Sequence, residues 1–173
     1  MGLGKRHIIL IGFMGAGKSS VARKIARWQH LSSIDIDVYL ERQEGLSVTQ
    51  IFSERGEEAF RDLETAFLET MPSRERTVLS CGGGIVIRQR NRELLKALGT
   101  VVYLRVSPEN VLRRVGGSSN RPLLNGAIAP DELLRQRQQL YEEVANLTVP
   151  TDECGINQVA REVIRKLKAR GEL

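Results

Sequence analysis

The chain has 173 residues, of which 41% are hydrophobic and 27% charged, a balance that excludes a disordered or fibrous protein and suits one soluble globular domain. Its 26 Lys and Arg residues against 21 Asp and Glu residues give a formal net charge of +5. Because the bases are interleaved with acids, aromatic residues make up only 5% and no recognition-module motif occurs, we expect no nucleic-acid partner.

A strand and a helix are predicted first. The apolar run from Ile8 to Ile11 leads directly into GFMGAGKS at residues 12–19, which fits the phosphate-binding loop G-x-x-x-x-G-K-[ST]. Its glycines let backbone N–H groups turn toward phosphate oxygens. Lys18 is expected to reach the β- and γ-phosphates and Ser19 to offer its hydroxyl to Mg²⁺, at the positive end of the following helix. A glycine-rich turn without a ligand is the alternative, and the strand and helix flanks argue against it. The residues expected to hold the nucleotide are Gly12, Met14, Gly15, Ala16, Gly17, Lys18, Ser19 and Ser20.

Residues 32–35 form a candidate second strand that ends in a pair of carboxylates, Asp35 and Asp37. The carboxyl edge of a parallel sheet is where ligands bind in such folds. One carboxylate could hold Mg²⁺ through water while the other accepts a hydrogen bond from a hydroxyl nucleophile. The alternative is structural, namely a helix N-cap followed by a first-turn acid.

Helices are predicted from Val38 to Glu44 and from Ser47 to Arg55, and a longer amphipathic helix runs from residue 57 toward Pro72, after a stop at Gly56. Arg61 and Glu64 lie three residues apart on the longer helix and therefore share one face. A solvated ion pair is the default interpretation of such a spacing.

A buried strand at residues 77–80 ends in Gly82, Gly83 and Gly84, a run that fits a backbone passing close to a ligand. A basic helix ending at Gly99 and a strand at residues 100–106 follow, and Ser107 with Pro108 begins another helix. Residues 131–144 and 156–169 are helical, with a short strand at 147–149 between them. Strands alternating with helices predict an α/β fold with a five-stranded parallel sheet covered by helices on both faces.

The Gly-, Ser-, Asn- and Pro-rich segment from Gly116 to Pro130 is the best candidate for a mobile lid, because loops this long in compact domains usually carry function. Arg121 lies in this segment and suits the covering of phosphates once a nucleotide is bound. Arg137, on the helix that follows, would by itself be interpreted as a surface charge.

Two cysteines, Cys81 and Cys154, are too few for a disulfide framework and indicate a reducing compartment. His7 and His30 form no paired motif and are interpreted as structural or surface residues. The basic and apolar N-terminus resembles a signal peptide, but cleavage there would remove the phosphate loop. We therefore expect a cytoplasmic protein without a membrane partner.

Other phosphate-loop classes fit poorly. GTPases need an NKxD motif, which is absent from the sequence, and the DxxG match that begins at Asp152 lies too near the end of the chain to be followed by a guanine-reading loop. A small-molecule kinase is the leading class.

Taken together, the motifs resemble those of the shikimate kinases: GFMGAGKS at 12–19, DID at 35–37, FRDLE at 60–64, CGGGIV at 81–86, RRVGG before NRPLL, and RQQLYEEVA from Arg137. The resemblance runs from residue 8 to about residue 149. It implies a P-loop kinase fold in one domain over residues 1–173, with substrate-binding helices at about 37–70 and a lid at about 116–130. It also implies transfer of the ATP γ-phosphoryl group to the 3-hydroxyl of shikimate in aromatic biosynthesis.

For the acceptor, the resemblance implies that Asp37 contacts the reacting hydroxyl and that Arg61 and Arg137 hold the shikimate carboxylate. Glu64 would orient Arg61. The backbone expected to line the acceptor pocket belongs to Gly82, Gly83 and Gly84.

For the donor, the resemblance implies that Lys18 and Arg121 stabilise charge on the transferring group. Ser19 would ligate Mg²⁺ and Asp35 would support the metal through water. Arg114 matches the residue that stacks near adenine.

A related gluconate or nucleoside monophosphate kinase is the alternative enzyme, and a nucleotide-binding regulator without activity is the alternative from another class. No expected catalytic position is missing, which argues against the regulator. The family suggests a monomer.

Overall fold

Five parallel strands form the central sheet of this computed structural model, which describes residues 7–71, 74–115 and 128–173. The strand order is β2-β3-β1-β4-β5. The bounds are Ser32–Asp35 for β2, Thr77–Ser80 for β3, His7–Ile11 for β1, Gly99–Arg105 for β4 and Leu147–Pro150 for β5. β1 and β3 are buried along their whole length, as strands covered on both faces must be. The predicted five-stranded parallel sheet is confirmed.

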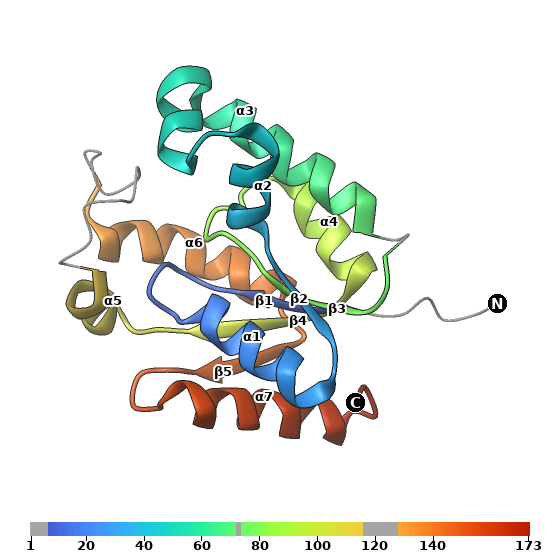
Figure 1. Cartoon of the computed structure of the whole chain (residues 1–173). Helices are drawn as coiled ribbons and strands as arrows, with labels where there is room; N and C mark the ends of the chain where they lie inside the picture. The colour runs from blue at the N-terminus through green and yellow to red at the C-terminus, as the bar shows by residue number, and fades with distance from the viewer. Residues whose placement is uncertain (1–6, 72–73, 116–127) are drawn as a thin grey trace.

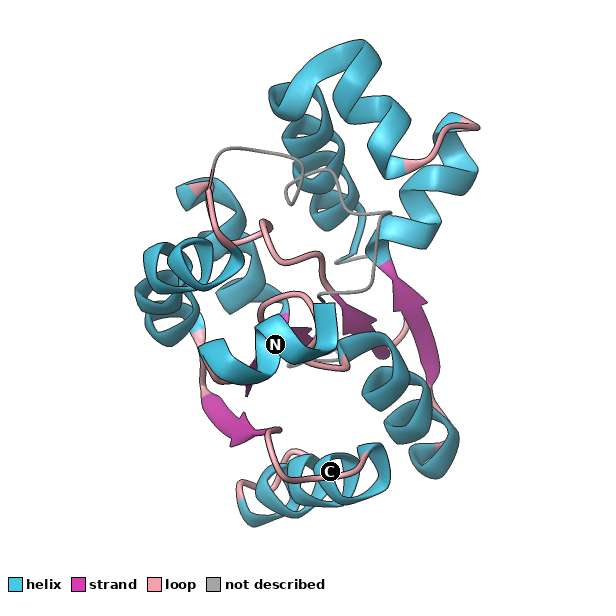
Figure 2. Ribbon diagram, turned by 90° about the vertical axis from the view of Figure 1, so that its left-hand side faces the viewer, coloured by secondary structure: helices cyan, strands magenta, loops and turns pink. Residues whose placement is uncertain are grey.

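Helices cover both faces of the sheet and complete three layers (Figure 1, Figure 2). On one face, α1 (Lys18–Gln29) packs against α7 (Ile156–Ala169). On the other face, α4 (Gln89–Leu98) and α6 (Pro130–Val144) contact β4 and each other, with α5 (Pro108–Val115) beside α6. The remaining pair, α2 (Ile36–Glu44) and α3 (Val48–Thr70), pack together beyond the β2 edge of the sheet.

Local signals account for the boundaries of these two helices. Asp35 is the N-cap of α2 and its Oδ1 accepts a hydrogen bond from Val38 N at 3.3 Å, so the helix begins two residues earlier than predicted. The backbone at Gly56 has φ 84° and ψ 167° and interrupts α3 where a stop was predicted.

One large apolar residue of α1 lies on the surface. Val21, Ala22, Ile25 and Ala26 of α1 are buried, but Trp28 in the last turn of the helix is 36% exposed. Its ring is flanked by the cationic groups of Lys24 and Arg161, which lie 5.5 and 5.9 Å from the ring centroid.

The sheet order brings three loops to one edge. β2, β3 and β1 are adjacent and parallel, with Asp35 in register with Ser80 and Leu10 also in register with Ser80. The phosphate loop, the start of α2 and the glycine run therefore follow neighbouring strand ends. The chain passes from β1 to β2 on one side and later to β4 on the other, so β1 ends at the switch point where ligands bind in open α/β sheets.

Most of the predicted lid, including Arg121, lies outside the described residues. Pro130, its last predicted residue, is the first residue of α6. In the described part of the chain, none of the helices combines the length and the apolar character needed to cross a membrane.

Candidate active site

The phosphate loop takes the conformation that its spacing predicts. Gly17 has φ 85° and ψ 16°, a left-handed conformation favourable for glycine, and forms the N-cap of α1. Lys18 and Ser19 consequently lie in the first turn of the helix, and Lys18 Nζ donates a hydrogen bond to Phe13 O at 2.8 Å. The predicted residues that line the adjacent cavity are Met14, Gly15, Gly17, Lys18, Ser19 and Ser20. Gly12 and Ala16 belong to the loop but are buried and do not line this cavity.

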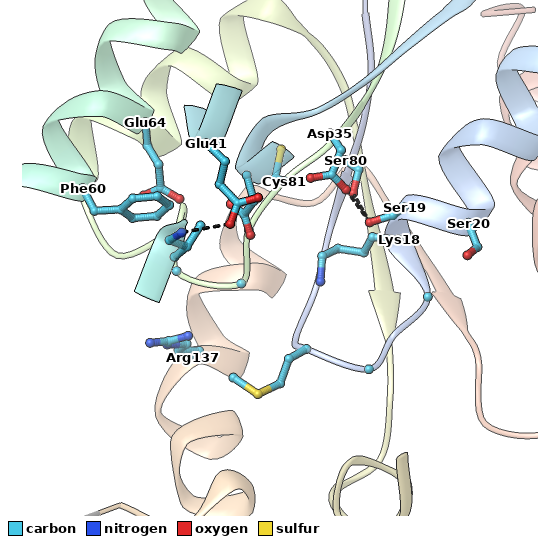
Figure 3. A pocket seen from close by; sticks show the side chains of 18 of the residues that line it. Lys18, Ser19, Ser20, Asp35, Glu41, Phe60, Glu64, Ser80, Cys81 and Arg137 are labelled. Carbon is cyan, nitrogen blue, oxygen red and sulfur yellow. Dashed lines mark hydrogen bonds between the residues drawn. The ribbon is translucent and has the colours of Figure 1, made fainter. Parts of the chain in front are cut away.

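The cavity at this sheet edge has a volume of about 610 Å³. Figure 3 shows Lys18, Ser19 and Asp35 on one side of it and Phe60 and Glu64 on the opposite side. The cavity is thus bounded by the phosphate loop at one end and by the α2–α3 pair at the other. A phosphate donor and an acceptor can be held face to face in such a space.

Hydroxyl and carboxylate oxygens gather where β2 and β3 end. Ser19 Oγ donates a hydrogen bond to Asp35 Oδ2 and lies 3.2 Å from Ser80 Oγ. The register of Asp35 with Ser80 explains why these groups meet beside the first turn of α1. Oxygen donors of this kind suit Mg²⁺, which usually takes one or two protein ligands together with waters and substrate phosphates. No group of three or more His, Cys, Asp or Glu side chains able to hold a metal occurs among the residues described.

Asp37 lies one residue into α2 and is directed into the cavity. Burial raises its pKa to about 6, and the negative charge of Asp35 acts in the same direction. Its Oδ1 is buried, and no partner for it is found within the described ranges. A carboxylate with this pKa can accept a proton or a hydrogen bond near neutral pH.

The pairing of Arg61 with Glu64 is buried, which corrects the expectation of a solvated ion pair. Arg61 is 3% exposed and Glu64 0%, and Arg61 Nη1 donates to Glu64 Oε2 at 2.8 Å. Arg61 Nη2 and Nε also donate to Glu57 Oε1 at 2.8 and 3.2 Å. Burial lowers the pKa of Arg61, but the two carboxylates outweigh it and the net shift is upward. The guanidinium is therefore a cation held in one orientation.

Burial raises the pKa of Glu64 to about 7, against the charge of Arg61. Its partner Arg61 is covered by two aromatic rings, since Phe52 and Phe60 flank the guanidinium with ring centroids 5.8 and 5.5 Å away. The ion pair is thus enclosed by apolar rings and by α3 itself.

The glycine run makes room for these charged side chains. A Cβ built on Gly82 would lie 2.7 Å from Asp37 Oδ1, and one built on Gly84 would lie 2.2 Å from Arg61 Nη2. At Gly83 the nearest atoms would be at ordinary contact distances of 3.5–3.7 Å. Without a side chain at Gly82 and Gly84, the carboxylate of Asp37 and the guanidinium of Arg61 can occupy this space.

Arg137 on α6 completes the wall beside the glycine run (Figure 3). It is 4% exposed, and burial lowers its pKa. Its Nη1 has no hydrogen-bond partner among the described residues, and the same is true of Glu64 Oε1. A buried guanidinium nitrogen in this state can donate a hydrogen bond to an acceptor in the cavity.

Arg114 of α5 reaches the phosphate loop and donates to Gly15 O at 3.1 Å and to Thr151 O at 2.8 Å. Asp152, the first residue of the DxxG match, has a structural role in this fold. Its Oδ1 accepts hydrogen bonds from Ser107 N and Asn110 Nδ2, both at 2.9 Å, and so holds the start of α5.

Some residues of the cavity escaped prediction. Five lining residues were assigned no role from the sequence, namely Glu41, Val48, Phe52, Ser80 and Cys81. For Ser80 and Cys81 the signal was present, because they connect a predicted buried strand to the glycine run. For the other three, only the packing of α2 against α3 brings them to the cavity.

A phosphate loop at the switch point of a parallel sheet, opening onto a cavity with two buried arginines, defines a P-loop kinase of the small-molecule class. Residues 14–168 match the family described as shikimate kinase. The shikimate kinase of Thioalkalivibrio sulfidiphilus is 45% identical over 162 residues, covering 92% of this chain and 85% of that protein. The enzyme of Vibrio parahaemolyticus is 40% identical and covers 96% of this chain and 98% of its own.

Among solved structures, the shikimate kinase of Acinetobacter baumannii in complex with shikimate superposes with a TM-score of 0.89 at 37% identity. The match covers 95% of this chain and 94% of that one. The chain belongs to the shikimate kinase family, a family of ATP-using kinases.

Proposed function

We propose that the chain transfers the γ-phosphoryl group of ATP to the 3-hydroxyl of shikimate, giving shikimate 3-phosphate and ADP in the shikimate pathway. The observation that carries this proposal is the convergence of Arg61 and Arg137 on one wall of a cavity whose other end is the phosphate loop. Both guanidinium groups are almost completely buried. Two buried cations call for an anionic acceptor, and a carboxylate fits the planar donor geometry of arginine.

The acceptor half of the site consists of Asp37, Arg61, Arg137 and the glycine run. Arg61 and Arg137 bind the substrate carboxylate and thereby fix the ring. With the ring anchored, a hydroxyl can reach Asp37, whose unpartnered Oδ1 accepts its hydrogen bond. The three glycines contribute backbone rather than side chains to this wall.

In the reaction, the substrate hydroxyl oxygen bonds to the γ-phosphorus while the bond from that phosphorus to the β,γ-bridging oxygen breaks, and ADP leaves. Asp37 orients the hydroxyl and takes up its proton as the new bond forms. Because phosphoryl transfer proceeds through a loose transition state, positioning and charge neutralisation contribute most of the catalysis. Lys18 supplies positive charge to the transferring group from the first turn of α1.

ATP requires a counter-ion, and the donors present fit Mg²⁺. Ser19 offers a direct hydroxyl ligand and Asp35 a carboxylate beside it. When bound, Mg²⁺ neutralises charge on the β- and γ-phosphates. Arg114, which contacts the carbonyl of Gly15, lies where it can border the nucleotide.

Action as a monomer, which the family resemblance suggests, stays a prediction. Cys81 and Cys154 are both free thiols, which supports a reducing, cytoplasmic compartment.

Coupled ADP-release assays test the proposal with shikimate, gluconate and AMP as parallel acceptors at equal Mg²⁺ and ATP. We expect turnover with shikimate to exceed that with either alternative by orders of magnitude. Comparable or higher turnover with gluconate or AMP would reassign the acceptor site, and ATP hydrolysis without any acceptor preference would reject the kinase assignment.

A further inference from the structure

Tyr141 is buried at the back of the acceptor wall, and none of the roles above uses it. It lies on α6 four residues after Arg137, so the two side chains share one face of the helix. Its ring is 0% exposed and stacks on Tyr103 of β4, with ring centroids 5.1 Å apart and an interplanar angle of 22°. The sheet thus fixes the place of the Tyr141 hydroxyl.

The hydroxyl of Tyr141 donates a hydrogen bond to the carbonyl of Gly83 at 2.5 Å. The neighbouring carbonyls are also held, since Gly82 O accepts from Ile85 N at 3.2 Å and Gly84 O from Ile87 N at 3.0 Å. In the glycine run, therefore, every carbonyl has a protein donor, but only the middle one depends on a side chain.

The hydrogen bond to Gly83 orients a peptide group that lies against the cavity. In a trans peptide the carbonyl and the following N–H point in opposite directions, so the bond from Tyr141 turns the N–H of Gly84 away from α6. Glycines on both sides would otherwise let this peptide rotate freely, and the hydrogen bond from Tyr141 prevents that rotation.

The same hydroxyl lies beside Arg137. Burial raises the pKa of Tyr141, while the charge and a hydrogen bond of Arg137 oppose that rise. A Cβ on Gly83 would lie 3.5 Å from Tyr141 Oη, 3.6 Å from Gly12 O and 3.7 Å from Arg137 Nη1. Gly83 is therefore located where α6, the phosphate loop and the acceptor wall meet.

We propose that Tyr141 is a positioning residue for the acceptor: its hydroxyl holds the Gly83 peptide and the Arg137 guanidinium in one arrangement, so that backbone and side chain meet the same substrate carboxylate. This role rests on the proposed function. It adds a link between α6, which packs on β4, α4 and α5, and the loop that follows β3.

Tyr141→Phe removes the hydroxyl and keeps the ring, and Tyr103→Phe is the matched control because it removes a hydroxyl from the stacked partner ring. For Tyr141→Phe we expect the shikimate KM to rise about fivefold to twentyfold, as for loss of a buried hydrogen bond, with the ATP KM changed less than about twofold. Tyr103→Phe should change neither KM. Equal rises in both KM values, or a melting temperature lowered with KM unchanged, would make Tyr141 merely structural.

A second measurement needs no substitution at Tyr141. In protein labelled with 3-fluorotyrosine, saturating shikimate should shift the ¹⁹F resonance of Tyr141 and leave that of Tyr103 nearly in place, with Tyr103→Phe and Tyr39→Phe used for assignment. An unmoved Tyr141 resonance in protein that phosphorylates shikimate rejects the positioning role alone. Failure of the wild-type protein to phosphorylate shikimate rejects the proposed function instead.

Discussion

The guanidinium of Arg61 lies where a side chain on residue 84 would have to be. A Cβ on Gly84 would approach Arg61 Nη2, Cζ and Nη1 at 2.2, 2.5 and 2.6 Å. Because Arg61 is enclosed by Glu64 and two aromatic rings, it cannot move aside without exposing or breaking a buried ion pair. Glycine at position 84 is thus a condition for burying the pair.

Gly84→Ala should therefore destabilise the protein by about 3 kcal/mol, the order of cost for breaking a buried ion pair. Gly83→Ala is the matched control, since its Cβ would have ordinary contacts, and it should change the free energy of unfolding by less than about 1 kcal/mol. Urea unfolding of the two variants measures the difference. Equal losses at both positions would show that the loop backbone, and not Arg61, sets the cost.

Arg137→Ala should raise the shikimate KM at least about 30-fold, because it removes one of the two buried cations proposed to bind the substrate carboxylate. The ATP KM should change little. Arg135→Ala is the control on the same helix, since the side chain of Arg135 is 62% exposed and forms surface ion pairs with Asp131 and Glu132. Steady-state kinetics with each substrate varied in turn give both constants. A parallel loss of ATP affinity would move Arg137 to the nucleotide half of the site.

Asp37 should govern the acid side of the pH profile. Its pKa of about 6 lies above the ordinary 3.8, so it is ionised and able to accept the hydroxyl proton only above about pH 6. We expect kcat/KM for shikimate to fall as pH drops through 6, and Asp37→Asn to lower kcat at least about a hundredfold. Retention of full kcat by Asp37→Asn would remove its assigned role.

The buried carboxylate of Asp37 should also lower the free energy of unfolding at neutral pH. Between pH 3.8 and about 6 the folded state binds more protons at Asp37 than the unfolded state, so this group makes the free energy of unfolding fall as pH rises through that window. Asp37→Asn should accordingly be more stable than wild type at pH 8, by about 2 kcal/mol, with the difference shrinking toward pH 4. Urea unfolding at the two pH values tests the sign.

Asp35→Asn should raise the Mg²⁺ concentration needed for half-maximal activity by about 10- to 100-fold. Asparagine is as good an N-cap as aspartate, so the hydrogen bond from Val38 N and the start of α2 are kept while the charge is lost. Mg²⁺ titrations at saturating ATP and shikimate measure the effect, and an unchanged melting temperature serves as the control. An unaltered Mg²⁺ requirement would leave Asp35 with only its capping role.

The pKa of His7 should lie below its ordinary value, so that the ring stays neutral to a lower pH than a free imidazole. Its Nδ1 accepts from Thr77 N at 3.2 Å, so the proton is on Nε2, which donates to Met71 O at 3.1 Å. Burial lowers its pKa below 6.5. The contribution of His7 to the free energy of unfolding is therefore fully present above pH 6.5. It is lost as the pH falls through the lowered pKa of His7 in the folded state. Long-range ¹H–¹⁵N spectra should show mostly the neutral Nε2–H tautomer at pH 6.5, and a ring that is at least half charged at that pH would contradict the prediction.

Local patterns were sufficient for much of the fold. The phosphate loop, the stop at Gly56 and the five strands depend on spacing between near neighbours, which the sequence displays directly. The burial of Arg61 and Glu64 cannot be predicted from such local spacing. A spacing of three places them on one face of a helix, but whether that face meets water or the aromatic rings of Phe52 and Phe60 depends on how α3 folds back at Gly56 and packs on α2.

By itself, the sequence determined that a nucleotide phosphate is bound and which residue types surround it, because a glycine-rich turn between strand and helix has one local geometry. The tertiary structure decided which of those residues contact one another. Gly82 and Gly84 leave room for the side chains of Asp37 and Arg61. The hydroxyl of Tyr141 donates to the carbonyl of Gly83, 58 residues away in the chain. Ser19 donates a hydrogen bond to Asp35. Such contacts arise only when parallel strands bring distant loops to one edge, since hydrogen bonding and steric exclusion act over a few ångströms of space regardless of sequence separation.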